Sequence, residues 1–151
     1  MNNSRRGIER FEEDFRLNRQ TLSHDFRNGL TVRLTNYATA GPAGTTQSVG
    51  GEAWGKRCFW MEYSEVIFTF EAPVSKVEFS VLLSQEHEGS WYRINEVGVP
   101  DSDTIPIPAN GGGIVMPKIV MFDSTLGIES FVISHVNNDQ ERLYVDNLFW
   151  E

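Results

Sequence analysis

The residues best suited to binding a polar ligand lie in the run Trp91-Tyr92-Arg93-Ile94-Asn95-Glu96. Side chains alternate between two faces along a strand, so Trp91, Arg93 and Asn95 would share one face. An indole ring covers the apolar C–H face of a sugar, while a guanidinium and an amide bind its hydroxyls. This spacing predicts a carbohydrate-binding face, to which Glu86 in the preceding polar loop would add a carboxylate. The alternative is that Trp91 is a core ring with Arg93 at the sheet edge.

A second aromatic candidate, Trp54, lies near the end of a long connection rich in Gly, Ala, Thr and Ser, Tyr37–Gly55. A connection of this length without secondary structure is usually functional or mobile. We therefore expect Trp54 to be exposed and to contact the ligand, together with Tyr37 at the start of the same loop. Trp60 and Trp150 lie in apolar runs and are expected in the core.

The sequence contains no recognisable catalytic set. His24, His87 and His135 are far apart, and there is no G-x-S-x-G, H-E-x-x-H or P-loop motif. No nucleophile, base and orienting residue can be assembled from the chain. The single cysteine, Cys58, begins an apolar stretch and is expected to be a buried, inert thiol. The sequence thus favours a binding module, with a hydrolase on the same scaffold as an alternative.

The composition excludes several classes of partner. The chain has 151 residues and a formal net charge of −8, so phosphate backbones would repel it and nucleic acid is not expected as a ligand. No apolar run approaches the roughly 20 residues that a membrane span requires. The polar, basic segment Met1–Gly7 lacks the apolar region of a secretory signal. It predicts a cytoplasmic location, unless a leader was removed or export is non-classical.

Period-two alternation of apolar and polar residues dominates the rest of the chain and predicts strands. Ile8–Phe11 is expected to form the first strand, with any helix confined to the residues after Glu12. The runs 66–70 and 77–81 flank a short turn containing Pro73 and are expected to be neighbouring antiparallel strands. Other predicted strands are 30–34, 91–99, 115–122, 130–136 and 143–150.

These strands predict an all-β fold, an antiparallel two-sheet β-sandwich or jelly roll, with a barrel as the structural alternative. Residues 1–7 would form a flexible leader and residues 8–151 a single domain.

Four segments also resemble a known superfamily: Ile8–Glu12, Val66–Phe79, Leu126–Ile133 and Val145–Trp150. They are similar to strands of the galactose-binding-like jelly-roll modules. That superfamily includes carbohydrate-binding modules and the sandwich domains of some PEP-CTERM-type bacterial proteins. The resemblance implies that the first and last strands are adjacent, and that the protein is a non-catalytic module for carbohydrate or a similar polar ligand.

The resemblance also implies a structural Ca²⁺ held by Glu12 and Asp146, one from each of these adjacent strands. Ca²⁺ takes six to eight oxygen ligands, for which carboxylates and backbone carbonyls are suitable. The alternative is that Asp146 and Asn147 only cap a bulge through side-chain to backbone hydrogen bonds. A second functional hypothesis is a structural or protein-interaction domain of a bacterial assembly or toxin system, with a protein partner or a homo-oligomer.

Overall fold

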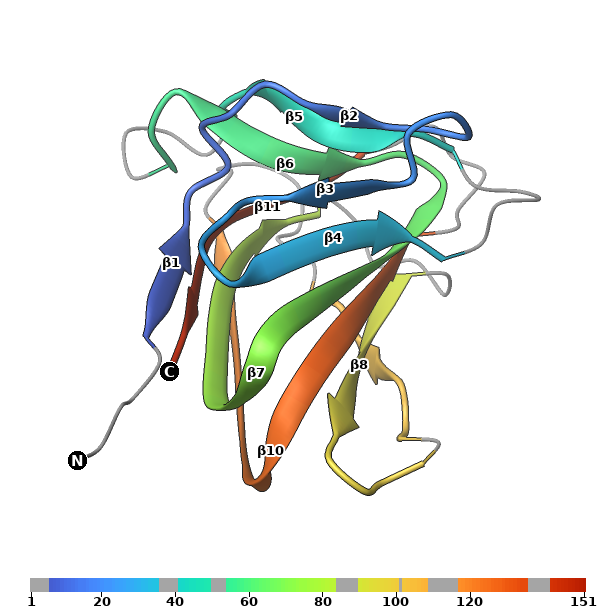
Figure 1. The fold of residues 1–151 in the computed structure, drawn as a ribbon. Coiled ribbons are helices and arrows are strands. Elements are labelled where there is room, and N and C mark those ends of the chain that lie inside the picture. The colour runs from blue at the N-terminus through green and yellow to red at the C-terminus, as the bar shows by residue number, and fades with distance from the viewer. Residues whose placement is uncertain are drawn as a thin grey trace.

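The fold is built almost entirely of antiparallel strands (Figure 1). The computed structural model describes residues 6–35, 41–49, 54–83, 90–100, 102–108, 117–135 and 142–151. Within these ranges there is no α-helix, and therefore no helix long and apolar enough to cross a membrane. The strands are β1 Gly7–Glu9, β2 Arg16–Leu17, β3 Ser23–Asp25, β4 Leu30–Leu34, β5 Ala43–Gln47, β6 Arg57–Met61, β7 Ser64–Leu82, β8 Ser90–Glu96, β9 Ile105–Pro106, β10 Lys118–His135 and β11 Leu143–Trp150.

Two long strands, β7 with 19 residues and β10 with 18, run through the whole domain. The first half of β7 pairs with the second half of β10, as in Val66 opposite Ile133, and the other two halves pair with each other, as in Val81 opposite Lys118. The register shifts between Asp123 and Ile128, where β10 bends. The bends turn one continuous hydrogen-bonded sheet into two layers.

One layer, here called the β4 sheet, consists of β3, β4, the first half of β7, the second half of β10, β8 and β9. The other, the β6 sheet, consists of β2, β5, β6, β11, the second half of β7 and the first half of β10. β1 pairs with β11, with Gly7 opposite Trp150. The predicted antiparallel β-sandwich with adjacent first and last strands is confirmed, and β1 begins at the last residue of the predicted leader.

Aromatic side chains from the two layers meet in the core. Phe68 of the β4 sheet lies 5.6 Å from Phe59 of the β6 sheet, between ring centroids. The rings of Phe79 and Phe131 are stacked at 5.5 Å. Trp150 is 3% exposed, which agrees with its predicted place in the core. Burial of these rings is the main force that holds the layers together.

The predicted hairpin around Pro73 is wrong. Residues 66–70 and 77–81 belong to the single strand β7 and do not pair with each other. Val74 is buried and lies opposite Ile128, so the Pro73 segment is a bend at which the strand passes from one layer to the other. The runs 115–122 and 130–136 likewise contribute to one strand, β10, rather than two.

The segment after Glu12 forms the short strands β2 and β3, so the suggested helix is also absent from the part of the chain described. Phe11 has a left-handed φ of 54°, which redirects the chain after β1. Phe11 and Phe15 are four residues apart, as on one face of a helix, but they both pack on Phe59 without forming one. The predicted long loop, Tyr37–Gly55, contains the strand β5.

Candidate functional site

The outer surface of the β4 sheet carries two rows of polar and apolar side chains in cross-strand register. One row runs Arg33, Ile67, Val132, Arg93, and the other Thr31, Thr69, Ser130, Asn95. Directly opposite residues project to the same side of a sheet, so each row is continuous across four strands. We call this surface the polar face; its members are Thr31, Arg33, Ile67, Thr69, Trp91, Arg93, Asn95, Ser130 and Val132.

Three of the predicted ligand contacts lie together on this face. The Arg93 guanidinium carbon is 5.6 Å from the centroid of the half-buried Trp91 ring. Asn95 donates a hydrogen bond from Nδ2 to Ser130 Oγ at 2.8 Å. Tyr92, by contrast, faces the core, where its ring stacks on Phe122 at 5.7 Å. The structure therefore gives Trp91, Arg93 and Asn95 the common face that the alternation predicted.

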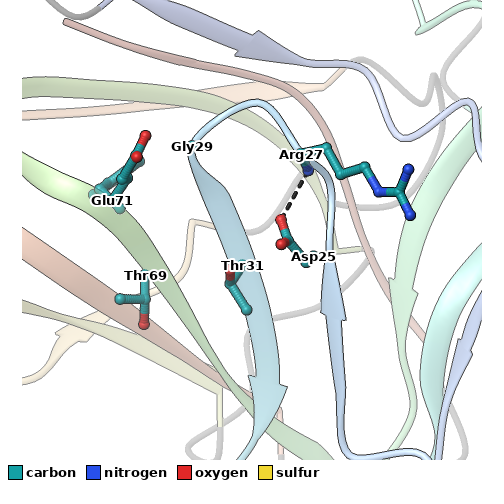
Figure 2. A pocket seen from close by; sticks show the side chains of 7 residues that line it. Asp25, Arg27, Gly29, Thr31, Thr69 and Glu71 are labelled. Carbon is teal, nitrogen blue, oxygen red and sulfur yellow. Dashed lines mark hydrogen bonds between the residues drawn. The ribbon is translucent and has the colours of Figure 1, made fainter.

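A hollow of about 360 Å³ lies at the end of the polar face, where β4 begins (Figure 2). It is lined by Asp25, Arg27, Gly29, Thr31, Thr69, Phe70 and Glu71. Asp25 Oδ1 accepts the backbone N–H of Arg27 at 2.8 Å, and Gly29, with a φ of 95°, allows the tight turn between β3 and β4. Thr31 and Thr69 belong to both the hollow and the polar face, so the two form one continuous surface.

Sequence reasoning missed this hollow. The turn signal Arg27-Asn28-Gly29 was visible in the sequence, but its proximity to Glu71 depends on the pairing of β4 with β7. Glu71 donates its backbone N–H to the carbonyl of Gly29 at 2.8 Å, which fixes the two segments side by side. The hollow combines carboxylates, hydroxyls and a guanidinium, which are the groups that bind sugar hydroxyls.

The prediction that Trp54 is exposed is wrong. Its side chain is only 2% exposed and packs with Cys58, Leu82 and Tyr144 against the outer surface of the β6 sheet. An indole covers more apolar surface by lying on this sheet than by standing in solvent, and a buried ring cannot stack on a sugar. Glu86 and Tyr37, the other two predicted ligand contacts, lie outside the residues that the structure describes.

Cys58 is buried, as predicted, and its thiol is protonated at neutral pH. Burial raises the pKa of Cys58 to about 11, and the neighbouring carboxylates of Asp146 and Glu12 add to this effect. A thiol with so high a pKa is a poor nucleophile.

The two predicted metal ligands, Glu12 and Asp146, lie close enough for their charges to interact. Asp146 is 0% exposed; its Oδ1 accepts the backbone N–H of Asn147 at 2.8 Å, and its Oδ2 has no hydrogen-bond partner. Burial raises the pKa of Asp146 to about 7, with a further contribution from the charge of Glu12. The hydrogen bond to Asn147 and the register shift after Asp146 also agree with the predicted bulge cap. A buried carboxylate oxygen without a partner, beside a second carboxylate, suits a hard cation.

No group of three or more His, Cys, Asp or Glu side chains suited to a metal ion occurs in the part of the chain that the structure describes. Backbone carbonyls or water would have to complete a coordination shell around Glu12 and Asp146.

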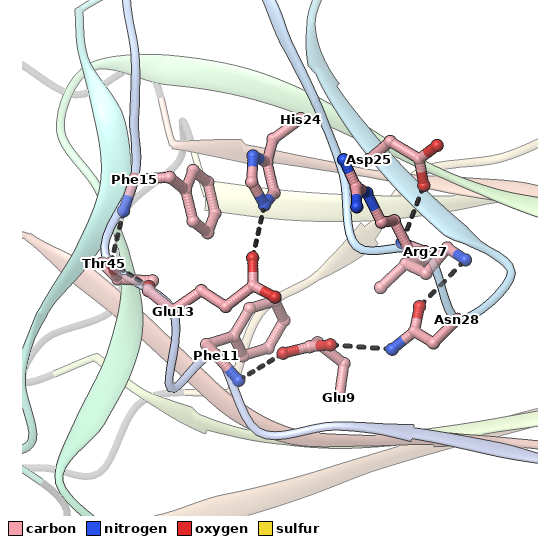
Figure 3. A network of polar contacts seen from close by, with 10 residues as sticks. Glu9, Phe11, Glu13, Phe15, His24, Asp25, Arg27, Asn28 and Thr45 are labelled. Carbon is pink, nitrogen blue, oxygen red and sulfur yellow. Dashed lines mark hydrogen bonds and ion pairs between the residues drawn. The ribbon is translucent and has the colours of Figure 1, made fainter.

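A polar network holds the N-terminal segment against β3 (Figure 3). His24 Nε2 lies 3.0 Å from Glu13 Oε2, and the His24 ring stacks on Phe15 with centroids 4.2 Å apart. Glu9 accepts hydrogen bonds from the backbone N–H of Phe11 at 2.7 Å and from Asn28 Nδ2 at 2.8 Å. Burial raises the pKa of Glu9. These polar groups bind one another within the domain, so we assign the network a structural role.

A serine–histidine contact also occurs, between Ser90 Oγ and His135 Nδ1 at 2.7 Å. Ser90 is 2% and His135 0% exposed, because both face the interior of the sandwich. A substrate has no access to a pair buried in this way, and the contact supplies no exposed nucleophile.

Comparisons with known proteins identify the fold. No family model matches the chain, and no curated protein matches it in sequence. Among solved structures, the K1 cleaved adhesin domain of Lys-gingipain from Porphyromonas gingivalis is similar with a TM-score of 0.54 and 14% identity, covering 86% of this chain and 96% of that one. The K2 cleaved adhesin domain of Lys-gingipain has a TM-score of 0.50 and 11% identity, covering 92% and 99%.

A family 11 carbohydrate-binding module from Clostridium thermocellum, in complex with a β-1,3-1,4-mixed-linked tetrasaccharide, has a TM-score of 0.47 and 12% identity, covering 96% and 94%. The two adhesin domains, with TM-scores of 0.54 and 0.50, confirm the predicted β-sandwich likeness for the fold. At these identities the similarity extends to the fold alone.

Proposed function

We propose that this protein is a non-catalytic binding module whose polar face binds a carbohydrate. One observation carries the proposal: Trp91, Arg93 and Asn95 project together from β8 and continue in register through Ser130 and Thr69 to the hollow beside Glu71. The ring supplies a surface for apolar sugar faces, and the hydroxyl, amide and guanidinium groups supply hydrogen bonds.

The size of the polar face favours an oligosaccharide over a single sugar. From β8 to β4 the rows cross three strand spacings, or roughly 14 Å at about 4.8 Å each. The hollow lies beyond this span at the β4 end. A chain of sugars would therefore lie across the strands, with one end against Trp91 and the other near Thr31 and Thr69.

Isothermal titration calorimetry against a panel of neutral oligosaccharides, with Ca²⁺ present, tests this proposal. Trp91→Ala and Asn95→Ala are each expected to weaken binding about tenfold or more, because truncated aromatic contacts and polar groups left unpaired cost over 1 kcal/mol. Met121→Ala, which alters a residue 57% exposed on the β6 sheet, is the control and should leave affinity unchanged. Absence of binding across the panel, or full affinity in Trp91→Ala, would contradict the proposal.

We also propose that Glu12 and Asp146 hold a structural Ca²⁺. The unpartnered Asp146 Oδ2 and the adjacent Glu12 support this. A bound cation would neutralise the two carboxylates and would tie β11 to the segment after β1.

Thermal unfolding in excess Ca²⁺ and in a chelator provides the test. Wild-type protein is expected to gain several degrees in Tm with Ca²⁺, and Asp146→Asn to lose that gain. Asp103→Asn, which removes an exposed carboxylate, should keep it. Equal Ca²⁺ effects in both variants would point to non-specific binding instead.

A further inference from the structure

The β6 sheet carries a second concentration of polar groups, around Trp60. The guanidinium carbon of Arg142 lies 4.3 Å from the Trp60 ring centroid, and that of Arg16 lies 5.9 Å from it. These arginines cover the indole, which is 6% exposed although it faces outward from the sheet. Arg142 is also paired with Glu62 at 3.7 Å, so its charge is locally compensated.

Arg16 differs from Arg142 because it forms no ion pair within the described ranges. It lines a hollow of about 370 Å³ together with Asn18, Arg19, Gln20 and Pro42. Among the residues that the structure describes, this lining contains two arginines and no carboxylate, whereas the hollow at the start of β4 and a neighbouring hollow beside Trp150 both contain Glu71. In a chain of net charge −8, a hollow whose described lining has two guanidinium groups and no carboxylate is a local site for negative charge.

The register of the sheet explains why Arg16 is held in place. Arg16 lies opposite Gly44, and Gly44 lies opposite Trp60. A Cβ at Gly44 would collide with the backbone carbonyl of Phe15, so only glycine lets β5 lie this close to the segment that enters β2. From this position the Arg16 guanidinium reaches the indole of Trp60. Contact with the ring restricts the motion of the guanidinium, so less conformational entropy is lost when a ligand binds it.

We propose that this hollow, called the Arg16 site, binds the oxyanion group of an acidic saccharide, either a carboxylate or a sulfate. A guanidinium donates two parallel N–H bonds to such a group. Asn18 Oδ1 accepts the backbone N–H groups of Gln20 and Thr21, at 2.8 and 2.9 Å, so the donor end of this amide is not used by the turn. The side-chain amides suit sugar hydroxyls, and the Pro42 ring suits an apolar sugar face.

The Arg16 site lies on the β6 sheet and is separate from the polar face. Its occupant is a saccharide rather than an acidic peptide, because the amides of Asn18 and Gln20 line the hollow beside the guanidinium groups and match the hydroxyls next to a charged group. A glycan with both neutral and charged segments would engage the two sheets at different points. The inference does not depend on neutral-sugar binding, and it is tested with different ligands and different variants.

NMR titration of the arginine Nε–H resonances tests the proposal, with the Arg16 signal assigned from Arg16→Lys. The probes are an oligogalacturonate, a sulfated galactan oligosaccharide, a neutral galactan of equal length and inorganic sulfate. Arg16→Gln is expected to weaken binding of the acidic probes about tenfold to a hundredfold, the effect of losing a hydrogen bond to a charged group. Arg16→Lys keeps the charge and is expected to lose most of the affinity as well, because ammonium lacks the planar fork.

The control Lys118→Gln removes an equal charge from another exposed position and should have no effect. Arg19→Gln provides a second variant of the hollow should Arg16→Gln fail to fold. Stronger binding of the uronate or of the sulfated probe identifies which oxyanion is preferred, and either result supports the proposal.

Three results would overturn it: unchanged affinity in Arg16→Gln, equal binding of the neutral galactan, or tighter Arg16-dependent binding of a poly-glutamate peptide. The last would identify an acidic protein segment as the ligand. Met121→Ala, at an exposed residue outside both sites, should leave binding of the acidic probes intact, and the Arg16 signal reports on this hollow rather than on the polar face.

Discussion

Asp146 couples the stability of this domain to pH because burial of its carboxyl outweighs the favourable charge of Arg10. The pKa of the folded-state carboxyl is about 7, well above its ordinary value of 3.8. The native state therefore holds a proton that the unfolded state releases between these two values. Stability falls as pH rises from about 4 to about 7 and levels off above that. The direction is opposite to that of a carboxylate stabilised by a salt bridge.

In metal-free protein, Asp146→Asn is therefore expected to raise the free energy of unfolding most at pH 8 and progressively less toward pH 4. A pKa difference of this size corresponds to an upper limit of about 4 kcal/mol, and a gain of 1–3 kcal/mol is expected after local relaxation. Urea denaturation at pH 4, 6 and 8 measures it. A variant less stable than wild type at pH 8 would contradict this account of Asp146.

At the residue scale, the alternation of the sequence predicts the face on which a side chain lies, but it does not predict whether that side chain is exposed. It placed Trp91, Arg93 and Asn95 on one face because period two follows from strand geometry alone. The wrong expectation for Trp54 came instead from the length and composition of its loop, because neither reveals that the ring packs on Cys58 of β6 and Leu82 of β7. Likewise Trp60 is buried, as predicted, but under two arginines on the outer face rather than in the core between the layers.

At the scale of the element, β7 determines the architecture. It contributes inward-facing phenylalanines to both layers, Phe68 and Phe70 to the β4 sheet and Phe79 to the β6 sheet. Short alternating runs were predictable because each satisfies the strand pattern locally. Their continuity through Pro73 was not, because a bend and a chain reversal share the same turn-forming residues. The distinction lies in the partner, β10, which bends at the matching place.

The packing of β7 predicts a large cost for removing Phe68. Its ring is 0% exposed and stacks on Phe131 at 4.7 Å while contacting Phe59 from the opposite layer. Phe68→Ala is expected to lower the free energy of unfolding by about 3–5 kcal/mol, the range for large aromatic cavities. Ile119→Ala, at a side chain 66% exposed on β10, should change it by less than about 0.5 kcal/mol. Chemical denaturation of both variants measures the difference, and similar losses would show that Phe68 is not a core contact.

At the scale of the molecule, the chain closes on itself through β11. This last strand pairs with β1, β6 and β7, so residues from both ends of the sequence and from its middle meet there. The sequence predicted that the first and last strands are neighbours only through the resemblance to jelly-roll modules. Alternation locates strands but carries no information about which strands pair.

This closure predicts that a chain ending at Arg142 does not fold cooperatively. Without β11, the core loses four buried side chains, those of Leu143, Val145, Leu148 and Trp150. β6 also loses the strand that joins it to β7. Two-dimensional NMR of the truncated protein should show the narrow dispersion of an unfolded chain, and adding residues 143–151 as a peptide should restore part of the native spectrum.

Because pairing of β1 with β11 joins distant parts of the chain, the intact protein should fold in about milliseconds to seconds, as other domains rich in non-local strand pairs do. A truncated chain with a sharp unfolding transition would mean that the layers are held together without their closing strand.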